Sequence, residues 1–386
     1  MKKLLFLLPA AALALASCSN DQVVEQPAKV ISAEALQIYP ELQGITRAAT
    51  VWDNGNFTSF SLTTSGSFQT NGTDPDDATT QQKFNGETVT KAGGVWKIGT
   101  EETWYWPSKS ASSSFQAWAP AGTVAGPYDA ANIANMKDIV VAYNSGSATD
   151  FESGVPLKFR HILSQIIVKA DNAAKSEIQI KVKGIRLKNI STTGTWALPT
   201  ASTASELGYS PWTNVGTAGD YLVNLDSEVT LTDGSATDIT GSAPLLLIPQ
   251  QLGKATIASK TGQYLSLLVE IIDLTKTSTD AGYYVYPRNH DTANGGATVC
   301  EFAWTAVDVN TLWESGKKYI YTLHFTKNGY GKIDGDTTGG NTNPGDDGNP
   351  ATEDPEPGED ITDAPVKLIL DVEVVDWVDV TEEHNM

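Results

Sequence analysis

Cysteine is nearly absent from this chain. Only Cys18 and Cys300 occur among the 386 residues, and the first lies in an N-terminal export signal described below. One remaining thiol cannot form an intramolecular disulfide, so the folded protein must be stabilised by packing. Histidine is almost as rare, with no His-Glu-x-x-His or paired-His spacing, so we expect no metal site. The four histidines are His161, His290, His324 and His384.

Positive charge is also in short supply. The chain has 26 Lys and Arg residues against 46 Asp and Glu residues, which gives a formal net charge of -20. Binding to a phosphate backbone needs a basic surface that releases counterions, and binding to an anionic membrane surface needs the same. We therefore expect no nucleic-acid partner, and contact with a membrane only through a lipid anchor.

Long hydrophobic runs are missing except at the N-terminus. There, Lys2 and Lys3 precede an apolar stretch, Leu4 to Leu15, that is too short to span a bilayer as a folded helix. The following Leu-Ala-Ser-Cys, which ends at Cys18, resembles a bacterial lipoprotein box, in which the cysteine is acylated and begins the mature protein. Several acyl chains make such an attachment stable. The alternative is an ordinary signal peptide with an incidental cysteine.

Helical periodicity is weak throughout the rest of the chain, with at most a turn or two at residues 130–136. Alternation of apolar and polar residues is strong instead, and the runs are short and bounded by turn residues. This pattern predicts an all-β protein built of antiparallel β-sandwich domains with minor helix. The clearest expected strands are residues 178–183, 265–271, 300–304 and 319–325, with a further strand-like stretch at 35–39.

Enzyme signatures are absent. No Gly-x-Ser-x-Gly elbow, Walker loop or dinucleotide fingerprint occurs, so we expect no catalytic residue and no cofactor. His161 lies beside apolar residues and is expected to be structural, while Cys300 shares a strand face with Phe302 and Trp304 and is expected to be an inert buried thiol. A cluster of aromatic residues could stack on sugar rings, but we favour a role in the core. These aromatic residues are Trp104, Tyr105, Trp106 and Trp118.

An acidic segment lies near the C-terminus, at residues 334–363. It contains ten acidic residues, no base and no aromatic residue, so it cannot bury enough apolar surface to fold and should be a solvated linker or loop. Asp334-Gly335-Asp336 begins like a calcium-binding EF-hand loop. The spacing then fails, because Thr338 stands at the fifth position and Gly345 at the twelfth.

The last expected strand, within residues 364–386, follows this linker. Its alternate positions are all apolar, and a strand on a flexible tether can pair with its own sheet or fill a groove on another molecule. From the residues alone, the ordinary last strand is the favoured reading. The alternating residues are Val366, Leu368, Leu370, Val372 and Val374.

Several motifs, in this order over nearly the whole chain, resemble those of the fimbrillins, the type V pilins of Bacteroidia that include the Mfa-like group. They are the lipobox Cys18, Thr46-Arg47-Ala48, Thr103-Trp104-Tyr105-Trp106-Pro107, Phe115 to Pro120, Val155 to Ser164, Leu246 to Gln250, Trp313 to Tyr321 and Asp376-Trp377.

The resemblance implies a lipoprotein precursor carried to the outer membrane, with a signal peptide at 1–18, a leader at 19–47 and two transthyretin-like sandwich domains at 48–155 and 156–333. It also implies that an Arg-specific protease cuts between Arg47 and Ala48 and frees a first strand. The C-terminal strand of a neighbouring subunit then fills the vacated groove, and a filament grows by strand exchange.

The acidic linker is longer than this pattern leads us to expect, and it leaves two alternatives. It lengthens a loop, or it lets the last strand fold back onto its own domain, which suits a tip, anchor or unpolymerised subunit. The expected partners are other pilin subunits, with a host or bacterial surface receptor or glycan as a further possibility. The competing hypothesis is an unpolymerised surface lipoprotein that binds glycan or host protein.

Overall fold

The fold is all-β. The computed structural model describes residues 35–42, 56–70, 81–100, 103–108, 110–132, 136–201, 209–233, 235–241, 245–253, 262–286, 301–305, 307–326 and 367–376. The described part of the chain contains no helix. Residues 133–135, the middle of the stretch expected to form a helical turn or two, lie outside the described residues, so that expectation stays a prediction. No helix among the described residues is long and apolar enough to cross a membrane.

Two sheets made from the N-terminal part of the chain enclose a first core. The larger has the order β2 (Ile38–Leu42), β12 (Val155–His161), β11 (Val140–Ser147), β9 (Ser112–Ala119), β3 (Ser59–Thr64), β6 (Asn85–Ala92) and β7 (Val95–Ile98). The smaller has the order β1 (Ala35–Leu36), β8 (Trp104–Tyr105), β4 (Phe68–Gln69) and β5 (Gln81–Gln82). Buried residues of both sheets form one cluster, as in a sandwich.

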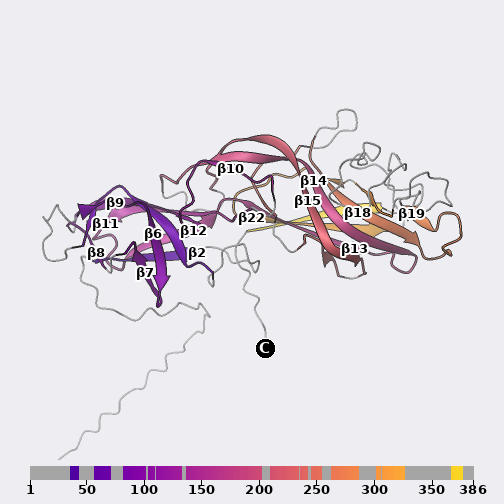
Figure 1. Cartoon of the computed structure of the whole chain (residues 1–386), viewed down its shortest axis with the longest axis horizontal. Coiled ribbons are helices and arrows are strands. Elements are labelled where there is room, and N and C mark those ends of the chain that lie inside the picture. Colours follow the sequence, from indigo (N-terminus) through magenta and orange to yellow (C-terminus); the bar gives the residue numbers. More distant parts are fainter. Residues whose placement is uncertain are drawn as a thin grey trace, which may run out of the picture. The chain divides into compact units, whose positions relative to one another are not determined.

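Two further sheets enclose a second, larger core. One has the order β10 (Pro127–Asp129), β14 (Ile178–Trp196), β18 (Tyr264–Asp273) and β19 (Tyr284–Tyr286). In the same sheet, β15 (Trp212–Thr230) pairs with β14, and β20 (Ala303–Trp304) and β21 (Val307–Asp308) pair with β18. The other contains β16 (Thr237–Asp238), β13 (Ser164–Asn172), β22 (Lys317–Thr326) and β23 (Lys367–Asp376), with β17 (Leu245–Leu247) on β13. Figure 1 labels most of these strands.

After β12, the last strand of the first group, the chain enters β13 of the second group through Ile162 and Leu163. One earlier strand, β10, already belongs to the second group, where it pairs with β14. The connection at Ile162 and Leu163 is slightly C-terminal to the domain boundary that we expected at Val155, because β12 is an interior strand of the first large sheet. The domain limits themselves stay a prediction.

Two strand pairs depart from the purely antiparallel arrangement expected from the sequence. β2 runs parallel to β12, and β13 runs parallel to β22. Parallel neighbours require a long connection between them, and in both pairs many other strands intervene along the chain. The expected all-β sandwich fold is confirmed. Alternation along a strand reports which face is buried but not the direction of the neighbouring strand, so it could not indicate these two parallel pairs.

The aromatic residues around Trp104 lie mostly in the core, as expected. Trp104, Trp106 and Trp118 are buried, and the indole nitrogen of Trp104 donates a hydrogen bond to the Ile98 carbonyl at 3.1 Å. The rings of Trp106 and Phe68 meet edge to face at 4.9 Å. The interpretation of these residues as core packing is confirmed for the three tryptophans, and they offer no exposed face to a sugar.

Two tyrosines that lie in the second core or pack against it should make the free energy of unfolding depend on alkaline pH. Burial raises the pKa of Tyr128 and of Tyr319 to about 12. A raised pKa means that the folded state favours the neutral phenol, which adds to the free energy of unfolding. This addition is complete below pH 10, and it should be lost as the pH rises from 10 towards 12. We expect the free energy of unfolding, measured in urea at pH 8, 10 and 11.5, to fall between pH 10 and pH 11.5.

Tyr128→Phe provides the matched comparison for this alkaline loss. The Tyr128 hydroxyl has one weak bond, to the Lys137 carbonyl at 3.4 Å, so the variant should unfold like the wild type at pH 8. Its loss of stability between pH 10 and 11.5 should be smaller, because no phenol remains there to ionise. An unchanged loss would contradict the assignment to Tyr128.

Candidate functional site

The candidate site is the place occupied by residues 35–42, which we call the leader segment. This segment lies inside the predicted leader, and it joins both sheets of the first sandwich. Its first two residues, in β1, pair antiparallel with β8 of the smaller sheet, and β2 pairs with β12 at the edge of the larger sheet. Figure 1 shows β2 alongside β12. A short segment thus completes two sheet edges at once.

Apolar residues at alternate positions hold the leader segment in the core. Leu36 and Ile38 are 7% and 6% exposed and belong to the first core cluster, and Leu42 packs against that cluster. Full burial of an aliphatic side chain contributes about 1.5 to 3 kcal/mol, so Leu36 and Ile38 together contribute roughly 3 to 6 kcal/mol. Loss of the segment would leave their places in the core unfilled.

Backbone pairing fixes the register of β2. The Val155 amide donates to the Gln37 carbonyl at 2.8 Å, and Ile38 lies opposite Val155. In a parallel ladder, alternate residues bond to the same neighbour, so Pro40 directs its nitrogen away from β12. Proline lacks an amide hydrogen and is therefore tolerated at this edge, where it also discourages pairing with a further strand.

Tyr39 packs directly over a glycine that lies next to β12, the partner strand of β2. Gly154 precedes β12 and has a φ of +98°, a conformation that side chains disfavour. A Cβ atom at this position would lie 2.1 Å from Cε2 and 2.5 Å from Cδ2 of Tyr39. The Tyr39 hydroxyl donates to the Gln37 side-chain carbonyl at 2.5 Å. The missing side chain of Gly154 therefore leaves a space that the Tyr39 ring occupies. We call this space the seat.

A tight turn holds this seat in place. The Ser147 hydroxyl and amide both donate to Asp150 Oδ2, at 2.6 and 2.7 Å, and these bonds lower the pKa of the Asp150 carboxyl. The Phe151 ring packs against Trp106 and Phe115, and the Gly154 amide donates to the Phe151 carbonyl at 2.7 Å. The seat is thus anchored to the first core independently of the leader segment.

The predicted C-terminal donor strand is paired within its own chain in this structure. β23 lies at a sheet edge, antiparallel to β22, and Leu370 is partly buried against the second core. The register places positions 368, 370, 372 and 374 opposite Phe325, Leu323, Tyr321 and Tyr319, which are all buried. Its role as a donor stays a prediction, as does the pairing that it adopts in an assembly.

Several predicted site residues lie outside the described residues. These are Cys18, Arg47, Ala48, Val366, His290, His384, Cys300 and the linker 334–363. His161 is described, and it is buried with its Nδ1 3.0 Å from Asp138 Oδ1, which suits the structural role that we expected. His324 Nδ1 similarly lies 2.7 Å from Asp171 Oδ2. Among the described residues, no group of His, Cys, Asp or Glu side chains is arranged to hold a metal ion.

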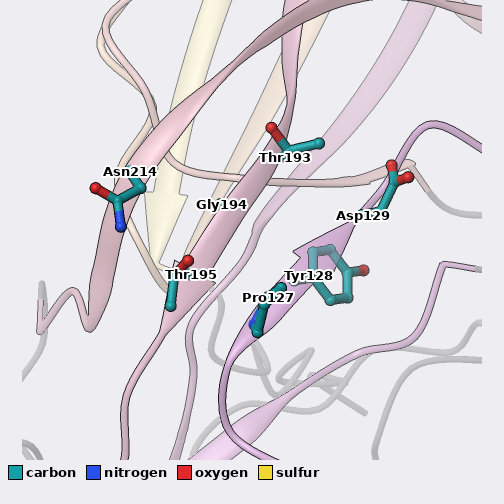
Figure 2. A pocket seen from close by; sticks show the side chains of 7 residues that line it. All are labelled: Pro127, Tyr128, Asp129, Thr193, Gly194, Thr195 and Asn214. Carbon is teal, nitrogen blue, oxygen red and sulfur yellow. The ribbon is translucent and has the colours of Figure 1, made fainter.

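A second candidate is a shallow hollow of about 250 Å³ where β10, β14 and β15 meet, shown in Figure 2. Its lining exposes more apolar than polar surface, although two threonines of β14 contribute to it. The Tyr128 ring packs edge to face against Trp212 at 5.5 Å. We find no feature that selects a ligand class. The lining residues are Pro127, Tyr128, Asp129, Thr193, Gly194, Thr195 and Asn214.

Sequence reasoning missed two residues that face the leader segment. They are Gly154, beneath Tyr39, and Lys158, opposite Glu41. In the sequence, Gly154 was recognisable only as a turn residue before a strand, and Lys158 only as a polar position within that strand. Their proximity to the leader segment depends on a parallel pairing between distant parts of the chain, for which the sequence contains no local signal.

A family model described as fimbrillin-like matches residues 46–340. No match was found among curated proteins. Solved structures with similar folds include a fimbrial protein from Bacteroides vulgatus, with 12% identity, a TM-score of 0.46 and coverage of 89% of this chain and 100% of the other. A candidate cell adhesion protein from Bacteroides ovatus has 13% identity, a TM-score of 0.43 and coverage of 90% and 99%, respectively. Both TM-scores are below 0.5, whereas the family model covers more than half of the chain.

Proposed function

Because the chain belongs to the fimbrillin-like family, we propose that it is a structural or adhesive subunit of a cell-surface pilus, assembled by protease-triggered donor-strand exchange. Membership of this family favours a fimbrial or adhesive role at the cell surface over an enzymatic one. The observation that carries the proposal is the leader segment, which completes the edges of two sheets and ends shortly before Arg47.

Cleavage between Arg47 and Ala48 would separate the leader segment from the rest of the chain. Its departure would leave β12 and β8 with unpaired backbone groups and would open the places of Leu36 and Ile38 in the core. A buried polar group without a partner costs about 1 to 3 kcal/mol, so the cleaved subunit would have a strong preference for a replacement strand. This requirement links proteolysis to assembly.

The C-terminal strand of a neighbouring subunit meets this requirement. Its five apolar residues, at about 1.5 to 3 kcal/mol each, would supply a gross stabilisation on the order of 10 kcal/mol before the entropy of association is subtracted. Each subunit would carry one groove and one donor strand. Contacts of this head-to-tail kind that do not close into a ring produce an open filament.

Export and anchoring form part of the same proposal. Acylation of Cys18 would hold the precursor in the outer membrane, and cleavage after Arg47 would release the subunit from its lipid. The alternative of an unpolymerised lipoprotein that binds glycan or host protein receives less support, because the tryptophans that could have stacked on sugar rings, Trp104, Trp106 and Trp118, are buried.

Treating the lipid-free precursor, residues 19–386, with an Arg-specific protease tests the proposal. We expect a new N-terminus at Ala48 and a ladder of multimers that resists SDS without heating. Arg47→Lys is the matched control, since it keeps the charge but removes the cleavage site, and it should stay monomeric. Cleavage at Arg47 that yields only monomer at high concentration would rule out stalk polymerisation.

A further inference from the structure

The seat at Gly154 and the charge of Lys158 give the groove two features that an incoming strand must match. β2 places Tyr39 opposite Pro156 and Glu41 opposite Lys158. Both Glu41 and Lys158 are exposed, and opposite charges directly across two strands stabilise the pair. The groove therefore favours a strand with the pattern of residues 38–42, in which three apolar residues are followed by one acidic residue and one further apolar residue.

The C-terminal strand contains this order at one position. Aligning Leu368–Val372 with Ile38–Leu42 puts Leu368, Leu370 and Val372 at the positions of Ile38, Pro40 and Leu42. It also puts Ile369 at the position of Tyr39 and Asp371 at that of Glu41. From this correspondence we propose that residues 368–372 of a second copy replace β2 in parallel orientation and in this register.

Shifted registers match less well. A shift of two residues towards the C-terminus keeps an acidic residue, Glu373, opposite Lys158, but it brings the carboxylate Asp371 to the seat that receives the Tyr39 ring. A shift in the other direction brings Lys367 to that seat and leaves the apolar Ile369 opposite Lys158. The single register that satisfies both the seat and the charge makes Gly154 and Lys158 the residues that specify the donor.

This inference rests on the proposed exchange, and it adds residue pairs that can be trapped. A disulfide requires Cα atoms about 4.4 to 6.8 Å apart, a distance that residues facing each other on adjacent strands satisfy. In the proposed register, position 371 of the donor faces position 158, and position 369 faces position 156. Within a single chain, β23 pairs position 371 with Thr322 instead, so the cross-link reports exchange between subunits.

The experiment mixes two versions of residues 19–386, both with Cys300→Ser. One carries Lys158→Cys as acceptor and the other Asp371→Cys as donor, and a second mixture carries Pro156→Cys and Ile369→Cys. After Arg-specific cleavage and mild oxidation, we expect both mixtures to give intermolecular disulfides, at least tenfold more than before cleavage. The mixture of Lys158→Cys with Glu373→Cys is the register control and should give much less.

Charge reversal provides a second measurement that needs no new thiol. Lys158→Glu should slow the growth of the ladder about fivefold, because like charges would face each other across the strands. Asp371→Lys in the donor should restore the rate with this acceptor. A ladder that forms but cross-links best through position 373, or through only one of the two proposed pairs, overturns the register while leaving strand exchange intact. If the wild-type chain forms no ladder after cleavage, the exchange itself fails and this inference fails with it.

Discussion

Gly154→Ala should destabilise the precursor by about 2 to 6 kcal/mol. Two independent effects add to this total. Holding alanine at a φ of +98° costs roughly 1 to 3 kcal/mol, and displacing the Tyr39 ring, which lies only 2.1 Å from the new Cβ position, costs a similar amount. Urea unfolding of residues 19–386, monitored by tryptophan fluorescence, measures the change.

Gly122→Ala separates the two effects. Gly122 also has a positive φ, +77°, but a Cβ atom there would meet nothing within 4 Å. This control should therefore show the backbone cost alone, roughly 1 to 3 kcal/mol. Gly154→Ala should also be made in a chain that already carries Tyr39→Ala. In that background the loss of stability caused by Gly154→Ala should fall to the level of the control, because the clashing ring is gone. If Tyr39→Ala leaves that cost unchanged, the ring does not occupy the seat.

The same substitution should loosen the leader segment. Displacing Tyr39 weakens the pairing of β2 with β12, and a segment that opens more often is cut more rapidly by proteases. We expect cleavage after Arg47 to be faster in Gly154→Ala than in Gly122→Ala. Equal rates in the two variants would show that the seat does not hold the leader segment.

Deleting residues 366–386 should abolish the ladder completely. The truncated chain keeps the leader segment and the groove but has no strand to donate. β23 lies at the edge of its sheet, and β22 is its one partner among the described strands, so its loss should leave a folded monomer with reduced stability. Deleting only residues 377–386 is the matched control, since it keeps β23 and should still form the ladder.

The truncated chain should also act as a terminator. After cleavage it can accept a donor strand from a full-length subunit, but it offers none to the next. Adding one truncated chain for every ten full-length chains should therefore shorten the ladder markedly, whereas the 377–386 deletion should leave its length unchanged. A ladder formed by the truncated chain alone would show that another strand is the donor. Loss of its circular dichroism signal would instead show that β23 is indispensable to its own sheet.

Much of the fold could be predicted from local patterns. Alternation located the long strands β14, β18 and β22 and the last strand β23, because the burial of every second side chain is already present in the order of the residues. The scarcity of cysteine indicated stabilisation by packing, and the aromatic residues around Trp104 were correctly placed in the core.

The candidate site could be predicted only in part. The leader segment and the C-terminal strand are visible as apolar alternations, and the resemblance to fimbrillins suggested how they relate. The roles of Gly154 and Lys158 could not be predicted, because a turn glycine or an exposed lysine does not indicate which residue will lie opposite it in the fold. The parallel direction of β2 was missed for the same reason.

The sequence by itself determined that this protein is all-β and that residues 35–42 and 367–376 each form a strand with one apolar face. Those properties depend on side-chain order, which is local. Only the tertiary structure decided that β2 runs parallel to β12, that Tyr39 lies over Gly154 and that β23 pairs with β22. A strand exposes the same backbone groups to any partner, so its neighbour is chosen by packing across the whole sheet.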